Sequence, residues 1–205
     1  MDGFEHHRAF LKRAEQKALL QDILNVLEKG PLYRPTMPKT GRPFSVMETN
    51  CGPLGWVSDK KGYRYQETHP KTGKPWPDIP NSLLSIWQKV SNFTAPPEAA
   101  LINYYPNTAK MGLHQDKDEQ DLNAPVVSIS LGNSAKFRLG GLKRRDKTTT
   151  LELQSGDVMV LGGRARLCYH GIDRIKPETS CLLETHTNLQ NGRLNITMRR
   201  VTIPQ

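Results

Sequence analysis

The stretch Arg193-Leu194-Asn195-Ile196-Thr197-Met198-Arg199 alternates strictly between polar and apolar side chains. A period of two is typical of a β-strand, so one face of this segment is expected to be apolar and the other polar. One interpretation is an edge strand whose polar face is solvated. The other is a ladder of donors aimed at one groove, because the planar guanidinium of arginine binds carboxylates through two hydrogen bonds. The strand by itself leaves both interpretations open.

Other short runs with the same period precede this stretch from residue 100 onward. Turn residues such as Gly132-Asn133, Gly140-Gly141 and Asn191-Gly192 separate them. With the closing strand, the predicted set is Leu101–Tyr105, Val126–Leu131, Lys136–Leu139, Thr148–Leu153, Val158–Leu161, Cys181–Glu184 and Leu194–Val201. Seven short strands without helices between them predict an antiparallel sandwich or barrel, and a fold that is mainly β with flanking helices (α+β).

The first hundred residues have a different character. Apolar residues at helical spacing predict a helix over residues 9–29, ended by Gly30-Pro31. A second helix is expected from about Asn81, as N-cap, to Phe93. Between them, residues 31–80 are rich in proline, glycine and basic residues and contain Trp56, Tyr63, Tyr65 and Trp76. Such a segment is long for a plain connection, so it is expected to contain short hairpins and a functional flap.

Composition limits the possible classes of protein. A chain of 205 residues with 36% hydrophobic and 24% charged residues is expected to form one globular domain. No apolar run approaches the roughly 20 residues that span a bilayer, and the N-terminus lacks the apolar core of a secretory signal, so we expect a cytoplasmic protein without membrane contact. The net charge of +9 modestly favours a polyanionic partner.

The cysteines and several histidines are given structural interpretations. Cys51, Cys168 and Cys181 form no C-x-x-C pair, so we expect small buried thiols rather than disulfides or a thiolate zinc site. His6-His7 near the N-terminus and His69 in a Thr-His-Pro loop are expected to be solvated.

The triplet His114-Gln115-Asp116 is the first candidate metal site. On an extended backbone, residues two apart point the same way, so the imidazole and the carboxylate converge. A distal histidine would complete the facial triad that suits iron(II), with His170 the natural candidate and His186 its rival. An H-x-D triplet alone is weak evidence, and zinc accepts the same ligands. The triad and the arginine ladder together are far more specific than either feature alone.

At this point the chain resembles the AlkB family of iron(II)- and 2-oxoglutarate-dependent dioxygenases. The shared pattern is H-x-D, a distal histidine and a closing R-x-N-x-x-x-R strand, in that order. The resemblance covers about residues 44–200 and also rests on Asn50-Cys51-Gly52, Gly55-Trp56, Gly62-Tyr63-Arg64-Tyr65, Lys74-Pro75-Trp76-Pro77, Leu101–Tyr105, Leu113–Glu119, Val127–Gly132, Gly140–Arg144 and Tyr169–Ile172.

The resemblance implies a double-stranded β-helix, or jelly roll, with an N-terminal nucleotide-recognition flap. It implies one domain over residues 1–205: an N-terminal helix and basic Pro-rich segment (1–43), the flap and a helix (44–95), and the catalytic core (96–205). Iron(II) would be held by His114, Asp116 and His170. The co-substrates would be O2 and 2-oxoglutarate, with one carboxylate of the latter at Arg193 and the other at Arg199. The remainder of its pocket would be formed by Asn103, Tyr105, Asn195 and Thr197.

The implied activity is oxidative demethylation of bases of the 1-methyladenine and 3-methylcytosine type, coupled to 2-oxoglutarate decarboxylation and releasing formaldehyde and succinate. The substrate would be alkylated single-stranded DNA or RNA, or duplex DNA after base flipping, because the pairing edge is hidden in a duplex. Trp56 and His114 would sandwich the base, with Tyr63 and Tyr65 near the base or its phosphates. Asp118 would favour a cationic base and Arg144 would hold the nucleotide. A monomer is the default expectation.

Two departures and three alternatives accompany this interpretation. The interval from His170 to Arg193 is longer than expected, which predicts a surface excursion around Glu178–Asn191. Met47-Glu48 places an acid ahead of the flap, where it could alter substrate preference. The alternatives are an oxygenase acting on tRNA bases or protein side chains, an inactive barrel that binds single-stranded nucleic acid, and a zinc hydrolase.

Overall fold

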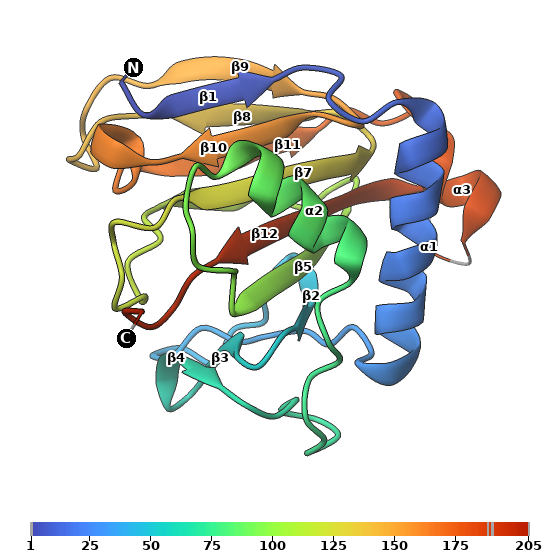
Figure 1. The fold of residues 1–205 in the computed structure, drawn as a ribbon, viewed down its shortest axis with the longest axis horizontal. Coiled ribbons are helices and arrows are strands. Elements are labelled where there is room, and N and C mark those ends of the chain that lie inside the picture. The colour runs from blue at the N-terminus through green and yellow to red at the C-terminus, as the bar shows by residue number, and fades with distance from the viewer. Residues whose placement is uncertain (1, 188, 190, 205) are drawn as a thin grey trace.

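The computed structural model describes residues 2–187, 189 and 191–204. Two antiparallel sheets face each other and form a jelly roll (Figure 1). The larger sheet has the strand order β1 (Phe4–His7), β10 (Val158–Leu161), β7 (Val126–Gly132), β12 (Gly192–Arg199), β5 (Ala99–Pro106) and β2 (Met47–Cys51). The smaller sheet has the order β6 (Met111–His114), β11 (His170–Ile175), β8 (Ala135–Leu139) and β9 (Thr149–Leu153). A separate hairpin pairs β3 (Gly55–Asp59) with β4 (Gly62–Gln66).

The closing strand β12 lies in the middle of the larger sheet, so the edge-strand interpretation is wrong. It pairs over its length with β5 on one side and with β7 on the other. Its apolar residues face the helices and are completely buried: Leu194, Ile196 and Met198. Burying one such side chain contributes roughly 1.5–3 kcal/mol, which is enough to fix the strand's register against a slip that would reverse its faces. The polar face therefore points into the space between the sheets.

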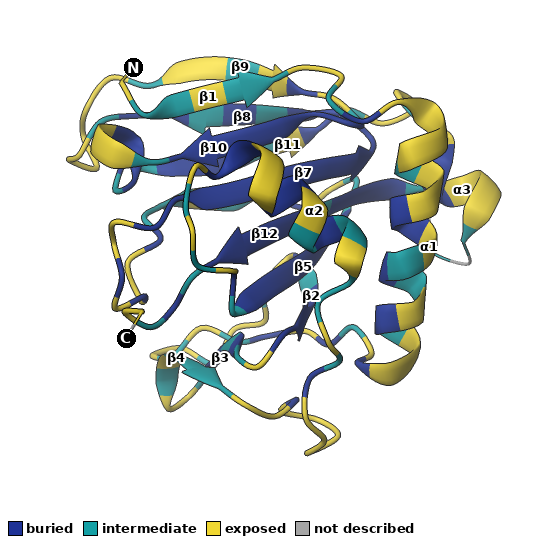
Figure 2. Cartoon of the chain, viewed as in Figure 1, coloured by how far each residue is buried: buried dark blue, intermediate teal, exposed yellow. Residues whose placement is uncertain are grey.

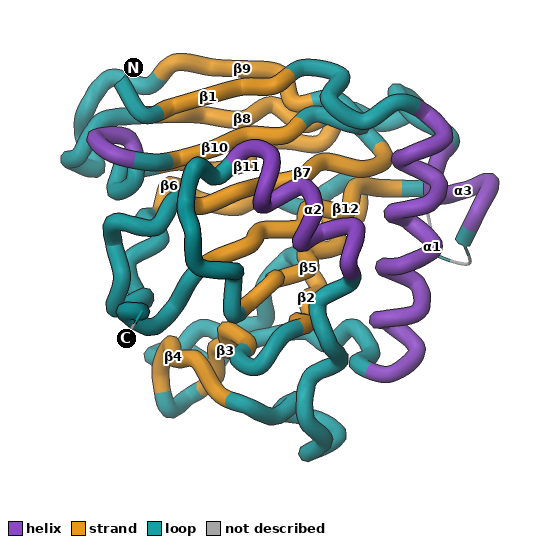
Figure 3. Tube along the Cα trace, in the orientation of Figure 1, coloured by secondary structure: helices purple, strands orange, loops and turns teal. Residues whose placement is uncertain are grey.

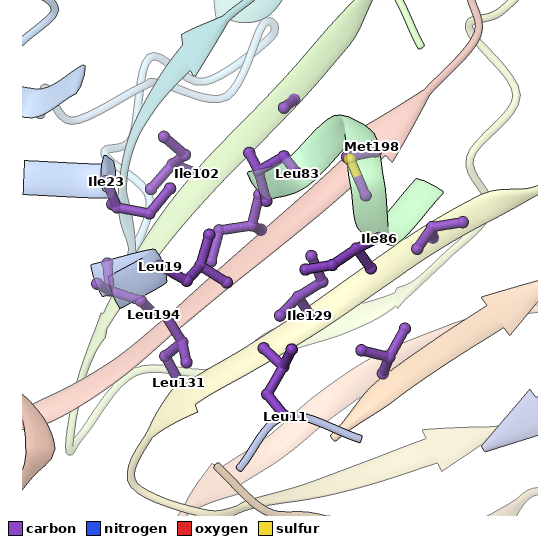
Figure 4. Close-up of a cluster of buried hydrophobic side chains, with 14 of the residues drawn as sticks. Leu11, Leu19, Ile23, Leu83, Ile86, Ile102, Ile129, Leu131, Leu194 and Met198 are labelled. Atoms are coloured by element: carbon purple, nitrogen blue, oxygen red, sulfur yellow. The ribbon is translucent and has the colours of Figure 1, made fainter. Parts of the chain in front are cut away.

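Two helices cover the outer face of the larger sheet: α1 (Arg13–Lys29) and α2 (Asn81–Val90) (Figures 1 and 3). Their buried side chains belong to one hydrophobic cluster with those of β5, β7 and β12, and Figure 4 shows Leu19, Ile23, Leu83, Ile86 and Met198 within it. Figure 2 shows the corresponding pattern, with the buried stripe of α1 turned to the sheet and the exposed stripe to solvent. Within the described residues, no helix is long and apolar enough to cross a membrane.

Both predicted helices exist, with shorter bounds. The first begins at Arg13 because the Glu15 carboxylate accepts from the backbone N–H of Lys12, the N-cap residue, at 2.7 Å. The second has Pro80 rather than Asn81 as N-cap. It ends at Val90, because Asn92 adopts a φ of 48°, a left-handed conformation that cannot continue a helix.

One predicted strand is wrong. Cys181–Glu184 falls largely in a short helix, α3 (Leu182–His186), rather than in a strand. The adjacent residues Leu182 and Leu183 are both buried, which a half-buried strand with alternating faces cannot achieve. The predicted excursion is therefore only partly on the surface, and its residues 188 and 190 lie outside the described residues.

Strand β11 of the smaller sheet was not among the predicted strands, because its polar and apolar residues do not alternate. Its register shifts between His170 and Ile172 and again between Ile172 and Arg174, so period-two patterning is lost. Strand β1 was also not predicted. There His6, expected to be solvated, lies 2.9 Å from the Asp157 carboxylate.

Two further expectations about isolated side chains are corrected by the structure. His69 is 1% exposed; its Nε2 lies 2.8 Å from the Pro31 carbonyl, and its ring packs between Tyr33 and Trp76. The polar loop sequence gave no sign of this cluster, which forms only when residues 31–33 fold against the flap. Cys181 is exposed, whereas Cys51 and Cys168 are buried as expected.

Candidate active site

The space between the two sheets contains a cavity of about 560 Å³. Its walls come from the polar face of the larger sheet, from β6 and β11 of the smaller sheet, and from the flap hairpin β3–β4. Of the fourteen site residues predicted from the sequence, all but Tyr65 line it: Trp56, Tyr63, Asn103, Tyr105, His114, Asp116, Asp118, Arg144, His170, Arg193, Asn195, Thr197 and Arg199. A set spread over more than 140 residues of sequence is thus gathered around one cavity.

Three of these residues form a cluster that can hold a metal ion. One ligand atom from each of His114, Asp116 and His170 lies within 4.8 Å of the other two. The strand pairing explains this convergence, because His170 on β11 is opposite His114 at the end of β6. The two imidazole rings are 4.5 Å apart between centroids, and His114 Nε2 is 3.8 Å from Asp116 Oδ1.

Backbone carbonyls set the orientation of both imidazoles. His114 Nδ1 lies 2.9 Å from the carbonyl oxygen of Gly112, and His170 Nδ1 lies 3.0 Å from that of Cys168. A carbonyl only accepts, so each Nδ1 donates its proton to that oxygen. Each Nε2 therefore keeps a free lone pair, which is the arrangement found in histidines that bind metals.

The electrostatics of the cluster favour ligands in their metal-binding forms. Burial alone would raise the pKa of the Asp116 carboxyl, but the charge and hydrogen bond of Arg199, together with the neighbouring His170 and His114, outweigh burial and hold that pKa well below its usual range. Burial, aided by the nearby His114, lowers the pKa of His170 to about 4. An ionised carboxylate beside a neutral imidazole is the state in which both bind a cation.

The two arginines of β12 have different surroundings. Arg199 donates from Nη2 to Asp116 Oδ2 at 2.9 Å and lies 3.4 Å from the Glu119 carboxylate. Arg193 is completely buried, and its Nη2 donates to Ser130 Oγ at 2.7 Å. No carboxylate is paired with Arg193 among the described residues, and burial lowers the pKa of its guanidinium to about 10.

Several buried polar atoms at this end of the cavity have no partner within the described part of the chain. They are Asn103 Oδ1, Arg193 Nε and Nη1, and Arg199 Nη1. An unpaired buried polar atom is costly, and the three arginine nitrogens are donors, so they indicate a site for an anionic ligand. Two arginines on one strand fit a dicarboxylate such as 2-oxoglutarate, and two imidazoles with one carboxylate fit iron(II). The residues present therefore match both groups.

The mouth of the cavity carries the aromatic and charged residues of the flap. Trp56 stacks on Tyr63 at 5.4 Å between ring centroids, and its indole N–H donates to Asp118 at 2.8 Å. Arg144 lies over the Tyr169 ring and donates to the carbonyl of Leu113 at 2.8 Å. Tyr63 is 48% exposed, so it is available to a ligand outside the cavity.

Tyr65 is the one predicted site residue that does not line the cavity. Its hydroxyl donates to Glu119 at 2.5 Å. The tip of the hairpin lies between Asp59 and Gly62, so Tyr63 is near the tip and Tyr65 sits deeper. Tyr65 therefore has an intramolecular partner, and its contact with the nucleotide stays a prediction.

The sequence did not reveal the residues that hold the cluster in place. Glu119 accepts from Tyr65 and Arg166 and lies beside Arg199, so it links the flap to the metal cluster. Arg166 is 2% exposed and also donates to the backbone carbonyls of Asp116 and Ala124. Glu119 was visible only as one acid in an acidic run, and Arg166 gave no signal. His186, the rival third ligand, is exposed on α3.

The fold and the site together define a class: jelly-roll proteins with a two-histidine, one-carboxylate cluster beside buried arginines. The family model described as the 2OG-Fe(II) oxygenase superfamily matches residues 3–199. Over 200 residues the chain is 46% identical to the alpha-ketoglutarate-dependent dioxygenase AlkB homolog of Caulobacter vibrioides, covering 97% of this chain and 87% of that protein. The chain therefore belongs to the AlkB family within this superfamily, and it is an iron(II)- and 2-oxoglutarate-dependent dioxygenase.

Other comparisons agree. The chain is 47% identical to the alpha-ketoglutarate-dependent dioxygenase AlkB of Escherichia coli over 167 residues, which cover 80% of this chain and 76% of that protein. It is 44% identical over 110 residues to the DNA N(6)-methyladenine demethylase ALKBH1C of Arabidopsis thaliana, covering 51% of this chain and 24% of that protein. The solved structure of OsALKBH1 superimposes with a TM-score of 0.80 at 31% identity and covers 97% of this chain and 96% of the other.

Proposed function

We propose that this dioxygenase removes methyl groups from the pairing edge of bases in nucleic acid. In this proposal His114, Asp116 and His170 hold iron(II). The 2-oxoglutarate site consists of Asn103, Tyr105, Arg193, Asn195, Thr197 and Arg199. The observation that carries the proposal is the position of the metal cluster between these residues and an aromatic flap, within one cavity.

When bound, iron(II), 2-oxoglutarate and O2 would supply the oxidising chemistry: one oxygen atom of O2 would go to 2-oxoglutarate, which loses carbon dioxide and becomes succinate, and the other to the N-methyl group, whose hydroxymethyl product releases formaldehyde. The protein supplies binding and orientation. Arg193 is buried with two unpaired N–H groups, which suits it to a carboxylate entering from the cavity. Arg199 bonds to Asp116 and fixes the orientation of that carboxylate towards the two imidazoles. Orientation of a metal ligand by such a partner typically changes affinity by about 10–100-fold.

The flap provides the surface for a base. Trp56 lies across the cavity mouth, held at its indole N–H by Asp118 and at its backbone by Asn50. His114 lines the same cavity, with its side chain 37% exposed. A base inserted between them would stack on both rings, which contributes about 1–3 kcal/mol per base. Such insertion requires a single strand or a flipped base, because the pairing edge is covered in a duplex.

The net charge of +9 supports a polyanionic strand, and the Arabidopsis relative named above is called a DNA demethylase. Arg144 and Tyr63 at the cavity mouth are the proposed contacts to the nucleotide outside the base pocket. The single-domain division with the flap at residues 44–95, the monomeric state and the cytoplasmic location stay predictions.

Formaldehyde and succinate release from a methylated single-stranded oligonucleotide tests the proposal. The assay contains iron(II), ascorbate and 2-oxoglutarate, with parallel DNA and RNA substrates carrying 1-methyladenine or 3-methylcytosine. Iron-dependent release of both products, in step with loss of the methyl group, is expected. Succinate without base repair would indicate a substrate of another class, such as a tRNA base that these oligonucleotides do not contain or a protein side chain. Neither product from folded, iron-loaded protein would favour a barrel that only binds nucleic acid.

A further inference from the structure

Glu48 is an acidic residue in the wall of the cavity that neither the metal cluster nor the proposed 2-oxoglutarate site uses. It lies on β2, directly opposite Asn103 of β5, and it lines the cavity while being only 1% exposed. Residues two apart on a strand share a face, so Asn50 points to the same side as Glu48. Its side chain therefore belongs to the inner face of the sheet and not to the surface of the flap.

The carboxyl group of Glu48 has little to compensate its burial. The Tyr33 hydroxyl donates to Oε1 at 3.1 Å, and it is the one hydrogen-bond partner of this side chain in the described part of the chain. Burial raises the pKa of Glu48 to about 8, although Tyr33 and the more distant Arg199 act in the opposite direction. At neutral pH the carboxyl group is thus mainly protonated and neutral, and it lines the cavity.

The same strand ties Glu48 to the proposed base platform. Asn50, two residues along β2, donates from its side-chain amide to the Trp56 carbonyl at 3.0 Å and accepts from the Trp56 N–H at 3.1 Å. Glu48 is therefore two residues from the strand position that holds the Trp56 backbone, and it is paired with Asn103 of the cavity. By contrast, Asp118 is exposed and already accepts from the Trp56 indole, so solvent screens its charge.

We propose that Glu48 is a specificity-determining residue that contacts the base in the cavity and favours positively charged methylated bases over neutral ones. The inference rests on the proposed function and deepens it. A cationic base draws the carboxyl group into its ionised form and gains a charge-assisted contact in a buried setting. The proton released by Glu48 passes to solvent. A neutral base provides no such compensation, and Glu48 then stays protonated.

The groups that bear on Glu48 belong to three elements. They are Tyr33 from the segment before β2, Tyr105 on β5 and Arg199 on β12. Tyr33 stabilises the ionised carboxylate by donating to it, so its removal is expected to weaken the same preference without touching the cavity lining. Tyr33→Phe is therefore a second variant that acts through Glu48.

The experiment compares 3-methylcytosine, which is cationic, with 3-methylthymine, which is neutral, in otherwise identical single-stranded DNA. For wild type, Glu48→Gln and Tyr33→Phe, kcat/KM is measured on both bases, and binding is measured by fluorescence anisotropy without iron. In Glu48→Gln the preference for 3-methylcytosine is expected to fall about tenfold, the size of one charge-assisted hydrogen bond. In Tyr33→Phe a smaller fall in the same direction is expected. Binding of 3-methylcytosine by wild type should also release a proton that Glu48→Gln does not release.

The matched control is Glu67→Gln, the same change at an exposed acid of the flap segment outside the cavity lining. An unchanged preference in Glu48→Gln, or an equal fall in Glu67→Gln, would overturn the proposal. So would a change confined to the KM for 2-oxoglutarate, because it would assign Glu48 to the co-substrate. The binding arm needs no turnover, so it decides the role of Glu48 even if wild type repairs neither base. That last result would contradict the proposed function alone.

Discussion

The floor and the rim of the cavity are built in different ways. The floor comprises Asn103, Tyr105, Arg193, Asn195 and Thr197, on two adjacent strands of the larger sheet. The rim comprises Trp56, Tyr63, Asp118 and Arg144, on a two-stranded hairpin and two loops. Floor side chains are largely buried and their positions follow from strand register, whereas Tyr63, Asp118 and Arg144 are exposed.

This difference indicates which ligand the floor binds and which ligand the rim binds. Strand pairing on both sides of β12 fixes the geometry of the floor, so its unpaired donors are in place before any ligand arrives. Such a floor suits a co-substrate that is the same in every turnover. A rim held by single hydrogen bonds, such as that from Trp56 to Asp118, can adjust to different strands. Changes in the floor should therefore affect 2-oxoglutarate, and changes in the rim should affect the nucleic acid.

The largest effect is expected at His114, where floor and rim meet. His114→Ala removes a proposed iron ligand and one face of the base platform. We expect turnover to fall by more than the roughly 10–100-fold that follows loss of a partner outside the ligand set. The Tm should change little, because the side chain is 37% exposed. Turnover and iron content are measured together, with His186→Ala on α3 as the matched control. Full iron binding in His114→Ala would contradict the assignment.

The two arginines of β12, Arg193 in the floor and Arg199 beside the metal cluster, test how the two ends of this strand differ. Arg199→Met leaves Asp116 buried without its cation, while Glu119 keeps Arg166, so we expect a stability loss of about 3–5 kcal/mol by urea unfolding. Arg193→Met removes a buried charge that has no carboxylate partner, so the 2-oxoglutarate-free protein should be as stable as wild type or more stable. Its KM for 2-oxoglutarate should rise at least about tenfold. Equal destabilisation by both changes would show that the two ends of the strand do not differ as described.

Trp56→Ala tests the rim. Loss of one stacking face should lower kcat/KM for a methylated strand roughly tenfold or more, in line with about 1–3 kcal/mol per stacked base. Oxidation of 2-oxoglutarate without repair should continue, because the floor is unchanged. The two products are quantified in the same reaction. Parallel loss of both activities would indicate that the flap also holds the floor, and would remove the distinction between the two regions.

The smallest expected effect concerns Glu48 and pH. Its pKa is about 8 in the folded protein against an ordinary value of 4.5, so the unfolded chain loses this proton first. Between those two pH values the folded state binds more protons, and its stability therefore declines as pH rises. Glu48→Gln should remove this decline. Its Tm gain over wild type should thus be larger at about pH 8.5 than at about pH 5.5. The difference should be several degrees, since about 1 kcal/mol shifts Tm by 2–4 °C. A constant gain across pH would contradict the raised pKa.

The sequence predicted much of the core and of the site, because both depend on local periodicity. Alternation in Arg193–Arg199 is enough to place three apolar residues on one face and four polar residues on the other. The spacing in His114-Gln115-Asp116 is likewise a local signal. The same reasoning failed where periodicity was absent or misleading: β11 contains two register shifts, and Leu182-Leu183 turned out to be helical.

The sequence by itself therefore determined the strand faces, the metal triplet and the family, since each is written in residues that are close together or in a fixed motif. Only the tertiary structure decided that β12 is a central strand, that His69 is buried, and that Glu119 and Arg166 hold Asp116 and Arg199 in place. It also decided that Glu48 faces the cavity with a single hydrogen-bond partner. These facts depend on contacts between segments far apart in the chain, and burial with its electrostatic consequences exists only after those segments have packed.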